Sequence, residues 1–328
     1  MSELLKTEHL SVSFFTDAGE VEAVRDVSFT VRKGEVLAIV GESGCGKSAL
    51  CKSIMKLLPK TAKIKSGKIL VNGVDITDYT EKNMSRLRGE LFSMVFQDPM
   101  SSLNPVYKVG DQVAEGLLQH NKGMKKAEAR EKVLEMFRKL GIPDPEERID
   151  CYPHQFSGGM KQRVVIAIAM ICNPELIICD EPTTALDVTI QAQIMELLKS
   201  LQVNEGKSII LITHNMGLVA EMADEVCVMY MGRVVEFGSL EDIFDHTSHP
   251  YTKALLRSVP VLGLGDDQKL ETIPGVTPNP ADLKEGCEFA DRCSECMEKC
   301  RKGKIPAFEV SPGHKVRCLK FDSYPEVK

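Results

Sequence analysis

The sequence predicts an α/β protein with a largely parallel sheet, and three observations support this fold class. Val36–Val40 is a continuous apolar run, as expected of a strand that is buried on both faces. A glycine-rich loop at residues 41–46 follows it, and a helix is expected from Lys47 to about Leu58. Further apolar segments then alternate with helical segments, which is the pattern of a parallel core.

The other elements follow from periodicity. Residues 7–32 predict short alternating strands with a turn at Asp17–Glu20. Residues 99–165 interrupt the α/β pattern and are mostly helical, with Lys125–Leu140 as the clearest amphipathic stretch, so we expect an inserted helical subdomain. The remaining core strands are expected at Ile69–Val71, Ser93–Phe96, Leu176–Cys179, Ser208–Thr213, Val226–Tyr230 and Val234–Phe237.

Length and composition exclude several classes of protein. With 328 residues, 43% of them hydrophobic, the chain can hold one large domain and an appendage. The net charge of −6 argues against a general nucleic-acid binder. No apolar run reaches the ~18–20 residues needed to cross a bilayer, and the N-terminus lacks the pattern of a signal peptide. We therefore expect a cytosolic protein whose role at a membrane would be peripheral.

The composition changes after about residue 260. Residues 261–328 are rich in proline and have few periodic apolar positions, so this tail is too short and polar to build a core alone. Of the eleven cysteines, six are scattered and are expected to be small core residues. We expect the other five to staple the tail: Cys287, Cys293, Cys296, Cys300 and Cys318.

The loop Gly41-Glu42-Ser43-Gly44-Cys45-Gly46-Lys47-Ser48 has the composition of a phosphate-binding loop. Its glycines let backbone N–H groups converge on an anion, and the following helix N-terminus adds partial positive charge. Lys47 is expected to reach the β- and γ-phosphates of a nucleotide, and the Ser48 hydroxyl to ligate Mg²⁺.

Two carboxylates, Asp180 and Glu181, close the predicted strand that starts at Leu176. Ligands of α/β sheets bind at the carboxyl ends of parallel strands. Asp180 is suited to hold Mg²⁺ through water, and Glu181 is suited to act as a general base that polarises the attacking water.

A second anion site is predicted at Ser157-Gly158-Gly159, which precedes a helix. A serine cap and two glycines leave helix N–H groups available to an anion. One chain does not need two such sites for one nucleotide. The site makes sense if it contacts the γ-phosphate held by the phosphate loop of a partner.

These motifs resemble the ATP-binding cassette (ABC) family over roughly residues 5–260. The resemblance implies a RecA-like core, an antiparallel β subdomain and the inserted helical subdomain. It implies that Gln97 is the Q-loop glutamine and that His214 is the switch histidine. The adenine-stacking aromatic corresponds to Phe14, or alternatively to Phe15.

Other family segments match with some departures. Ala185-Leu186-Asp187 corresponds to the D-loop. The usual Leu-Ser-Gly-Gly-Gln is Phe156-Ser157-Gly158-Gly159-Met160 here, which keeps the anion-binding residues but loses the side-chain amide and the hydrogen bonds that amide would make. Cys45 fills a variable position that is often serine. We expect the helix N-terminus and Lys47 to lower the pKa of Cys45 and make it a nucleotide-sensitive thiol.

Longer segments are similar to the peptide and nickel importer branch of the family. They are residues 96–105, residues 180–193 and the segment His249-Pro250-Tyr251-Thr252. The resemblance implies that Cys287, Cys293, Cys300 and Cys318 hold a [4Fe–4S] cluster, with Cys296 left over. From the residues alone, four thiolates in a proline-rich segment are compatible with an iron–sulfur cluster, zinc or unligated thiols.

The resemblance implies an ATPase subunit that powers peptide import through closure of a dimer. Its partners would be a second, homologous ATPase subunit in a heterodimer or a homodimer, two membrane permease subunits and, indirectly, an extracytoplasmic peptide-binding protein. The alternatives are a soluble ABC ATPase acting on nucleic acid or ribosomes, and an importer of nickel or another small solute. The cofactors would be ATP, Mg²⁺ and the cluster.

The resemblance also assigns site residues to four roles. Catalysis is assigned to Glu181, His214 and Gln97. ATP binding is assigned to Phe14, Gly41, Glu42, Ser43, Gly44, Cys45, Gly46, Lys47, Ser48, Ala49, Gln97 and Asp180. Contact with ATP held by the partner is assigned to Ser157, Gly158, Gly159 and Asp187. Mg²⁺ binding is assigned to Ser48, Gln97 and Asp180.

Overall fold

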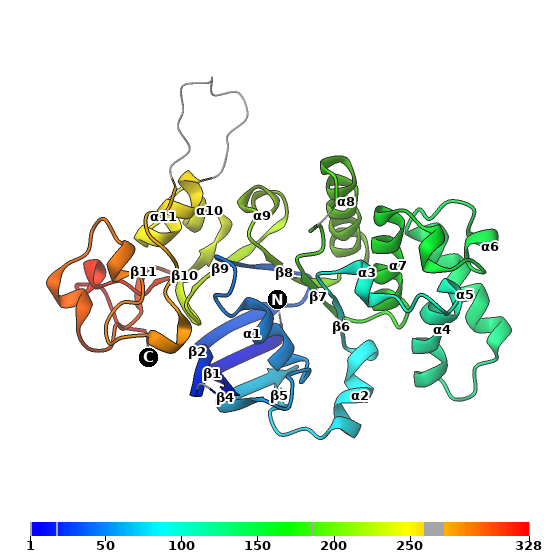
Figure 1. The fold of residues 1–328 in the computed structure, drawn as a ribbon, viewed down its shortest axis with the longest axis horizontal. Coiled ribbons are helices and arrows are strands. Elements are labelled where there is room, and N and C mark those ends of the chain that lie inside the picture. The colour runs from blue at the N-terminus through cyan, green and yellow to red at the C-terminus, as the bar shows by residue number, and fades with distance from the viewer. Residues whose placement is uncertain (1, 18, 185, 259–271, 328) are drawn as a thin grey trace. The chain divides into compact units, whose positions relative to one another are not determined.

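The structure is a computed structural model that describes residues 2–17, 19–184, 186–258 and 272–327 (Figure 1). Its contacts divide the chain into two compact units. We name the first the helical unit; it holds Arg32–Glu35 and Asp78–Ile212. We name the second the phosphate-loop unit; it holds Glu3–Val31, Val36–Thr77 and Thr213–Lys328.

The phosphate-loop unit contains a four-stranded sheet in the order β2-β1-β4-β5. Its strands are β1 (Glu3–Thr16), β2 (Gly19–Arg32), β4 (Ala62–Val71) and β5 (Val74–Asp75). The sequence predicts several short strands in residues 7–32, and this is wrong, because there are two long ones. A register shift between Glu8 and Ser11, with His9 at a φ of 50°, changes the phase of the apolar alternation without ending β1.

A second group of strands in this unit has the order β11-β12-β10-β9-β3. Strand β3 (Val36–Val40) is parallel to β9 (Glu225–Tyr230), and β10 (Arg233–Ser239) is antiparallel to β9. The helices are α1 (Lys47–Ile54), α9 (Met216–Met222), α10 (Leu240–Phe244) and α11 (Pro250–Arg257). Helix α1 ends before the predicted Leu58, because Lys56 adopts a φ of 51° that a right-handed helix does not allow.

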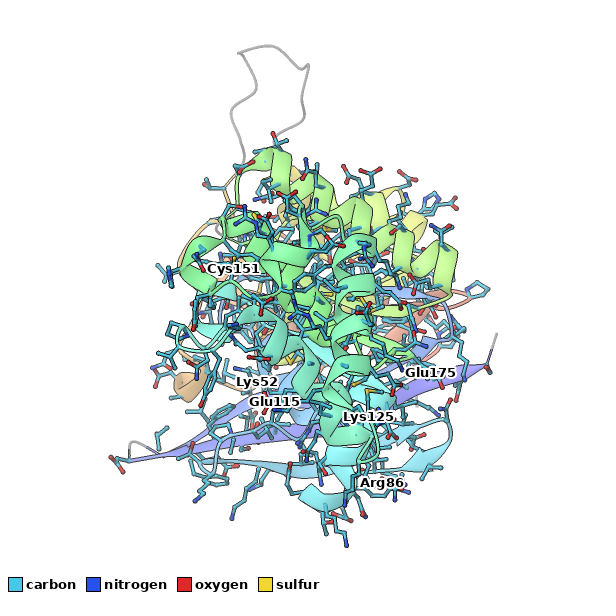
Figure 2. All side chains as sticks on the ribbon, turned by 90° about the vertical axis from the view of Figure 1, so that its right-hand side faces the viewer. Lys52, Arg86, Glu115, Lys125, Cys151 and Glu175 are labelled. Atoms are coloured by element: carbon cyan, nitrogen blue, oxygen red, sulfur yellow. The ribbon has the colours of Figure 1, made fainter. Side chains whose placement is uncertain are left out.

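The helical unit carries three parallel strands in the order β8-β7-β6: β6 (Phe92–Val95), β7 (Leu176–Asp180) and β8 (Ser208–Thr213). Residues 99–165 are mostly helical, as the sequence predicts. Figure 2 labels Glu115 on α4 and Lys125, which caps α5. The helices are α2 (Glu81–Glu90), α3 (Pro99–Ser102), α4 (Val109–His120), α5 (Lys126–Lys139), α6 (Pro145–Arg148), α7 (Gly158–Met170) and α8 (Val188–Glu205).

The tail joins the core of the phosphate-loop unit instead of building its own. Strand β12 (His314–Val316) pairs with β10 and with β11 (Phe308–Ser311), and Figure 1 shows these orange and red segments beside β10. Phe289 is 2% exposed, and its ring lies 5.3 Å from the rings of both Tyr230 and Tyr251. The tail therefore gains its apolar burial from strand β9 and helix α11.

A buried carboxylate adds a polar link between the tail and the core. Glu236 of β10 accepts hydrogen bonds from the backbone N–H groups of Ser248 (2.7 Å) and His249 (3.1 Å). His314 Nε2 of the tail lies 2.9 Å from the same carboxylate. Removing one partner would leave a buried charge short of hydrogen bonds, so this group fixes the tail against β10.

Candidate nucleotide site

The loop between β3 and α1 depends on glycine at two positions. Gly41 has a φ of 150°, and a Cβ there would lie 2.2 Å from the Met229 carbonyl oxygen. Gly46 has a φ of 104°, and a Cβ there would lie 2.1 Å from the Ala23 carbonyl oxygen. Any side chain at these positions would push the loop off the strands behind it, which explains the glycine spacing in physical terms.

Lys47 begins α1 and lies under the loop. Its side chain is buried, and its Nζ donates to the carbonyl oxygens of Gly41 (2.7 Å) and Glu42 (2.9 Å). The ammonium is thus positioned by the loop itself, within reach of an anion that the loop N–H groups would bind. Ser48 follows in the first turn of α1.

Cys45 does not have the environment predicted from the sequence. Its side chain is 1% exposed, and burial raises the pKa of the thiol above its usual value. The Lys47 ammonium, 3.7 Å from Sγ, acts in the opposite direction but is the weaker influence. The prediction of a lowered pKa is therefore wrong, because desolvation outweighs the nearby positive charge.

A cluster of polar side chains forms at the end of β7 in the helical unit. Gln97 Nε2 donates to Glu181 Oε2 at 2.8 Å, and the Thr184 hydroxyl donates to the same oxygen at 2.9 Å. Asp180, the last residue of β7, is 3% exposed. The sequence predicted Gln97, Asp180 and Glu181 as site residues, and the structure brings Gln97 and Glu181 into contact.

Glu181 has an unusual backbone. Its φ is 48°, a left-handed conformation that costs a glutamate about 1–3 kcal/mol. The Glu181 N–H donates to the Ile212 carbonyl at 2.9 Å, and its carbonyl accepts from the Thr184 N–H at 3.2 Å. The turn therefore aims the carboxylate at Gln97 instead of letting β7 continue, which is the geometry expected of a functional residue.

The predicted second anion site has the expected helix cap. Ser157 caps α7, and its hydroxyl accepts a hydrogen bond from the Met160 N–H at 3.3 Å. Gly159 packs against α8, because a Cβ there would lie 2.7 Å from Ile190 Cγ2. Arg163 donates to the Leu140 carbonyl and, at 3.1 Å, to Gln193 Oε1, so α7 is joined to both α5 and α8.

The remaining predicted residues lie at element ends. Asp187 caps α8, and its Oδ1 accepts from the Ile190 N–H at 3.0 Å. Ala185 of the predicted D-loop lies outside the described residues. His214 directly follows β8 and is exposed. Phe15 is exposed, with the Lys65 ammonium 5.4 Å from its ring centroid, whereas Phe14 is half-buried.

Glu42 has contacts that the sequence analysis missed. Its N–H donates to the Tyr251 hydroxyl at 2.9 Å, and its carboxylate accepts two hydrogen bonds from Arg292 of the tail, at 2.6 and 2.9 Å. The partners are separated by 250 positions in the sequence, so no local pattern could have paired them.

Known proteins match this chain along nearly its whole length. Residues 24–184 match the family described as "ABC transporter", and residues 235–300 match "Oligopeptide/dipeptide transporter, C-terminal region". The dipeptide transport ATP-binding protein DppD of Bacillus subtilis (strain 168) is 51% identical over 99% of this chain and 97% of its own length. The chain belongs to the ABC transporter family. The oligopeptide transport ATP-binding protein OppD of the same strain is 49% identical over 97% of this ABC protein and 88% of its own length.

Solved structures confirm the ABC ATPase fold. The dimeric cassette MJ0796, in a post-hydrolysis state bound to ADP and Pi, is 27% identical with a TM-score of 0.65, over 72% of this chain and 99% of that one. The protein cbiO1 from Clostridium perfringens, part of the ABC transporter complex cbiONQ, is 33% identical with a TM-score of 0.64. That match covers 75% of this chain and 92% of cbiO1. Among the helices described for this ABC protein, none combines the length and apolar character needed to span a bilayer.

The five tail cysteines of this ABC protein line one cavity, together with His249, Phe289 and Ile305. All five are thiols without disulfide bonds. Burial raises the pKa of Cys287 to about 12 and also raises the pKa of Cys293 and Cys318. Within the described ranges, however, no group of three or more Cys, His, Asp or Glu side chains is arranged to hold a metal ion. The [4Fe–4S] cluster therefore gains no support from the side-chain geometry, and Cys296 lines the same cavity as the four cysteines to which the resemblance assigns the cluster.

Proposed function

We propose that this chain is the ATP-hydrolysing subunit of a peptide importer. The observation that carries the proposal is the likeness, at about half identity and over nearly the full length, to transport ATP-binding proteins named for dipeptides and oligopeptides. A soluble ABC ATPase acting on nucleic acid or ribosomes is not favoured, because these relatives are transport proteins and residues 235–300 match a transporter-specific region.

In the proposed catalytic site, the phosphate loop and Lys47 bind the nucleotide, and Glu181 is the general base. The Gln97 amide, 2.8 Å from Glu181, holds the carboxylate that would take a proton from the attacking water. His214 would contact the γ-phosphate, and Phe14 or Phe15 would stack on adenine. The oxygen donors of Ser48, Gln97 and Asp180 fit Mg²⁺, which would neutralise charge on the transferred phosphoryl group.

The proposed cycle requires two ATPase subunits. Each nucleotide would lie between the phosphate loop of one subunit and the Ser157 helix start of the other, with Asp187 beside it. The dimeric form of the MJ0796 cassette, bound to ADP and Pi, supports this arrangement. The cap on α7 and the close approach of Gly159 to α8 would present these residues to the second subunit together. The second subunit would be a homologue in a heterodimer, with a homodimer as the alternative.

The helical unit offers a surface for a permease. A groove of about 920 Å³ is lined by residues of α4 and α5, including Gly110, Glu115 and Lys126. Tyr107 also lines the groove and is 59% exposed, and the neighbouring Val106 is 72% exposed, so both side chains are available to a docking segment. We infer that a cytoplasmic segment of each permease subunit docks here and receives the motion of Gln97 through the helices that follow it.

This role places the protein on the cytoplasmic face of the membrane as a peripheral subunit. Substrate would arrive on an extracytoplasmic peptide-binding protein. We divide the chain into an ABC ATPase domain at residues 1–260, with its helical subdomain at about 99–165, and a C-terminal extension at 261–328. The boundary itself lies outside the described residues.

Co-purification tests the assembly. Affinity-tagged protein from detergent-solubilised membranes of its own host is expected to bring down two integral membrane proteins and one homologous ATPase. Val106→Asp with Tyr107→Ser should reduce recovery of the membrane proteins while leaving ATP binding intact, because neither residue is among those assigned to nucleotide binding and both belong to the helical unit. Recovery of ribosomes or nucleic acid, without membrane proteins, would contradict the proposed function.

The cysteine cavity is proposed as an iron–sulfur site with Cys287, Cys293, Cys300 and Cys318 as ligands. The donor set supports this: thiols that share one cavity suit soft metals. When bound, a [4Fe–4S] cluster would cross-link the tail through iron–thiolate bonds. Because the side chains do not form a preset ligand group, we assign the cluster no step in transport.

Anaerobic purification tests the iron–sulfur site. Protein isolated without oxygen should be brown, and each of Cys287→Ser, Cys293→Ser, Cys300→Ser and Cys318→Ser should bleach it, since each removes one thiolate ligand. Cys296→Ser is the matched control, because it removes a thiol from the same cavity and should leave the colour unchanged. Stoichiometric zinc without iron would contradict the cluster.

A further inference from the structure

We propose that Arg292 of the C-terminal extension is a positioning residue for the phosphate loop, so that nucleotide binding depends on how the extension is seated. The inference deepens the proposed function, because it concerns the same ATP site. It rests on the contacts of Glu42, the second residue of the loop.

Arg292 and Glu42 form a bidentate ion pair. Arg292 Nη1 donates to Glu42 Oε2 at 2.6 Å, and Nη2 donates to Oε1 at 2.9 Å. The Thr277 hydroxyl, also from the extension, donates to Oε2 at 3.3 Å. The Arg292 side chain is 6% exposed, so solvent screens this pair less than a surface pair. Paired hydrogen bonds between guanidinium and carboxylate fix direction as well as distance.

Arg292 is itself held firmly by the extension and the core. Its Nε donates to the Pro274 carbonyl at 2.9 Å, and Nη1 also reaches the Tyr230 hydroxyl at 3.3 Å. The guanidinium lies 5.9 Å from the ring centroids of Tyr230 and Phe289. Hydrogen bonding to Glu42 raises the pKa of Arg292 further, so it stays charged. The group is therefore a fixed positive charge, not a flexible surface arginine.

The carboxylate, the N–H and the carbonyl of Glu42 each make a hydrogen bond. Its carboxylate is held by Arg292 and Thr277, its N–H donates to the Tyr251 hydroxyl, and its carbonyl accepts from Lys47 Nζ. The loop around it contains three glycines with positive φ, which on their own would allow many conformations. Because phosphate binding requires the loop N–H groups to converge, fixing Glu42 lowers the conformational entropy that binding would otherwise remove.

Charge gives Arg292 a second effect. Glu42 places a carboxylate in a loop that must accept a polyphosphate, and like charges repel. Arg292 neutralises this carboxylate. Without Arg292, the loop would be both less ordered and more negative, and both changes weaken ATP binding. In a variant without Arg292, removing the Glu42 charge should abolish the added repulsion of ATP but should not restore the order of the loop. This difference provides a specific test.

The test measures ATP binding by the full-length chain with titration calorimetry, and KM and kcat of its ATPase activity. Arg292→Met is expected to raise the Kd and KM for ATP about 10-fold, while kcat changes less than about 2-fold, because Arg292 positions the loop and contacts no reacting atom, so ATP and the transition state lose binding equally. Arg292→Lys, which keeps the charge but loses the fork, should fall between wild type and Arg292→Met. Arg301→Met is the matched control, because Arg301 is an exposed arginine of the same extension, paired with Asp291.

Rescue separates the charge effect of Arg292 from general damage to the fold. Glu42→Gln added to Arg292→Met should recover a large part of the lost affinity, whereas a variant that had simply misfolded would not recover. ATP affinity within 2-fold of wild type in Arg292→Met, or no recovery in the double variant, would overturn the proposal. If Arg292→Met does not fold, wild-type affinity and KM in Arg292→Lys would overturn it equally. Failure of the wild-type chain to bind ATP would instead refute the proposed function.

Discussion

Glu181→Gln is expected to bind ATP with near wild-type affinity and to hydrolyse it about 10²–10⁴-fold more slowly, the usual effect of losing a general base. The amide has nearly the same shape and can still accept from the Thr184 hydroxyl, which lies 2.9 Å from the carboxylate. It cannot take a proton from water. ATP should therefore remain bound, and the dimer that ATP closes should accumulate.

The measurement is steady-state phosphate release with nucleotide binding and gel filtration in parallel. Glu196→Gln is the matched control, because Glu196 is an exposed glutamate on α8 and should leave turnover unchanged. Phosphate release by Glu181→Gln within about 3-fold of wild type would show that another group activates the water.

Lys47→Ala should abolish tight ATP binding, with an affinity about 10²-fold lower, since charged hydrogen bonds are worth roughly 1.5–3 kcal/mol each and 1.4 kcal/mol is tenfold. Lys47 also holds the loop carbonyls of Gly41 and Glu42, so its loss disorders the loop as well as removing the charge. Lys47→Arg should also bind ATP poorly, because Lys47 is buried and a planar guanidinium is bulkier than the ammonium that the loop carbonyls hold.

Titration calorimetry with ATP checks this second expectation. Lys52→Ala removes a lysine from the last turn of the same helix and should bind ATP normally. Retention of binding in Lys47→Ala would mean that the loop N–H groups alone hold the phosphates, against the role proposed for this ammonium.

The sequence predicts those parts of the fold that a few neighbouring residues are enough to specify. The apolar run of β3, the glycine spacing of the loop and the apolar end of β7 each specify their structure within a few residues. The serine cap of α7 is of the same kind. The ends of helices and strands were less predictable. Helix α1 ends at Ile54 because Lys56 has a positive φ, and the register shift near His9 interrupts the apolar alternation that would reveal the full length of β1.

The missed features depend on distant contacts. The sequence assigns Glu42 to ATP binding, but its ion pair with Arg292 depends on the tail packing against the loop. Cys45 has a helix N-terminus and a lysine nearby, as the sequence indicated, but its burial against the strands reverses the expected pKa shift. Both cases involve packing between segments that are far apart in the chain, and no spacing rule describes such packing.

ATP-driven peptide uptake tests the central claim most directly. The chain, its homologous ATPase and the two permease subunits should be reconstituted in vesicles with ATP on the side that holds the ATPases and the peptide-loaded binding protein on the other. We expect labelled peptide to accumulate on the ATP side only when ATP and Mg²⁺ are present, and not with Glu181→Gln. Steady ATP hydrolysis without accumulation of any di- or oligopeptide, or accumulation of nickel in its place, would contradict the assignment to peptide import.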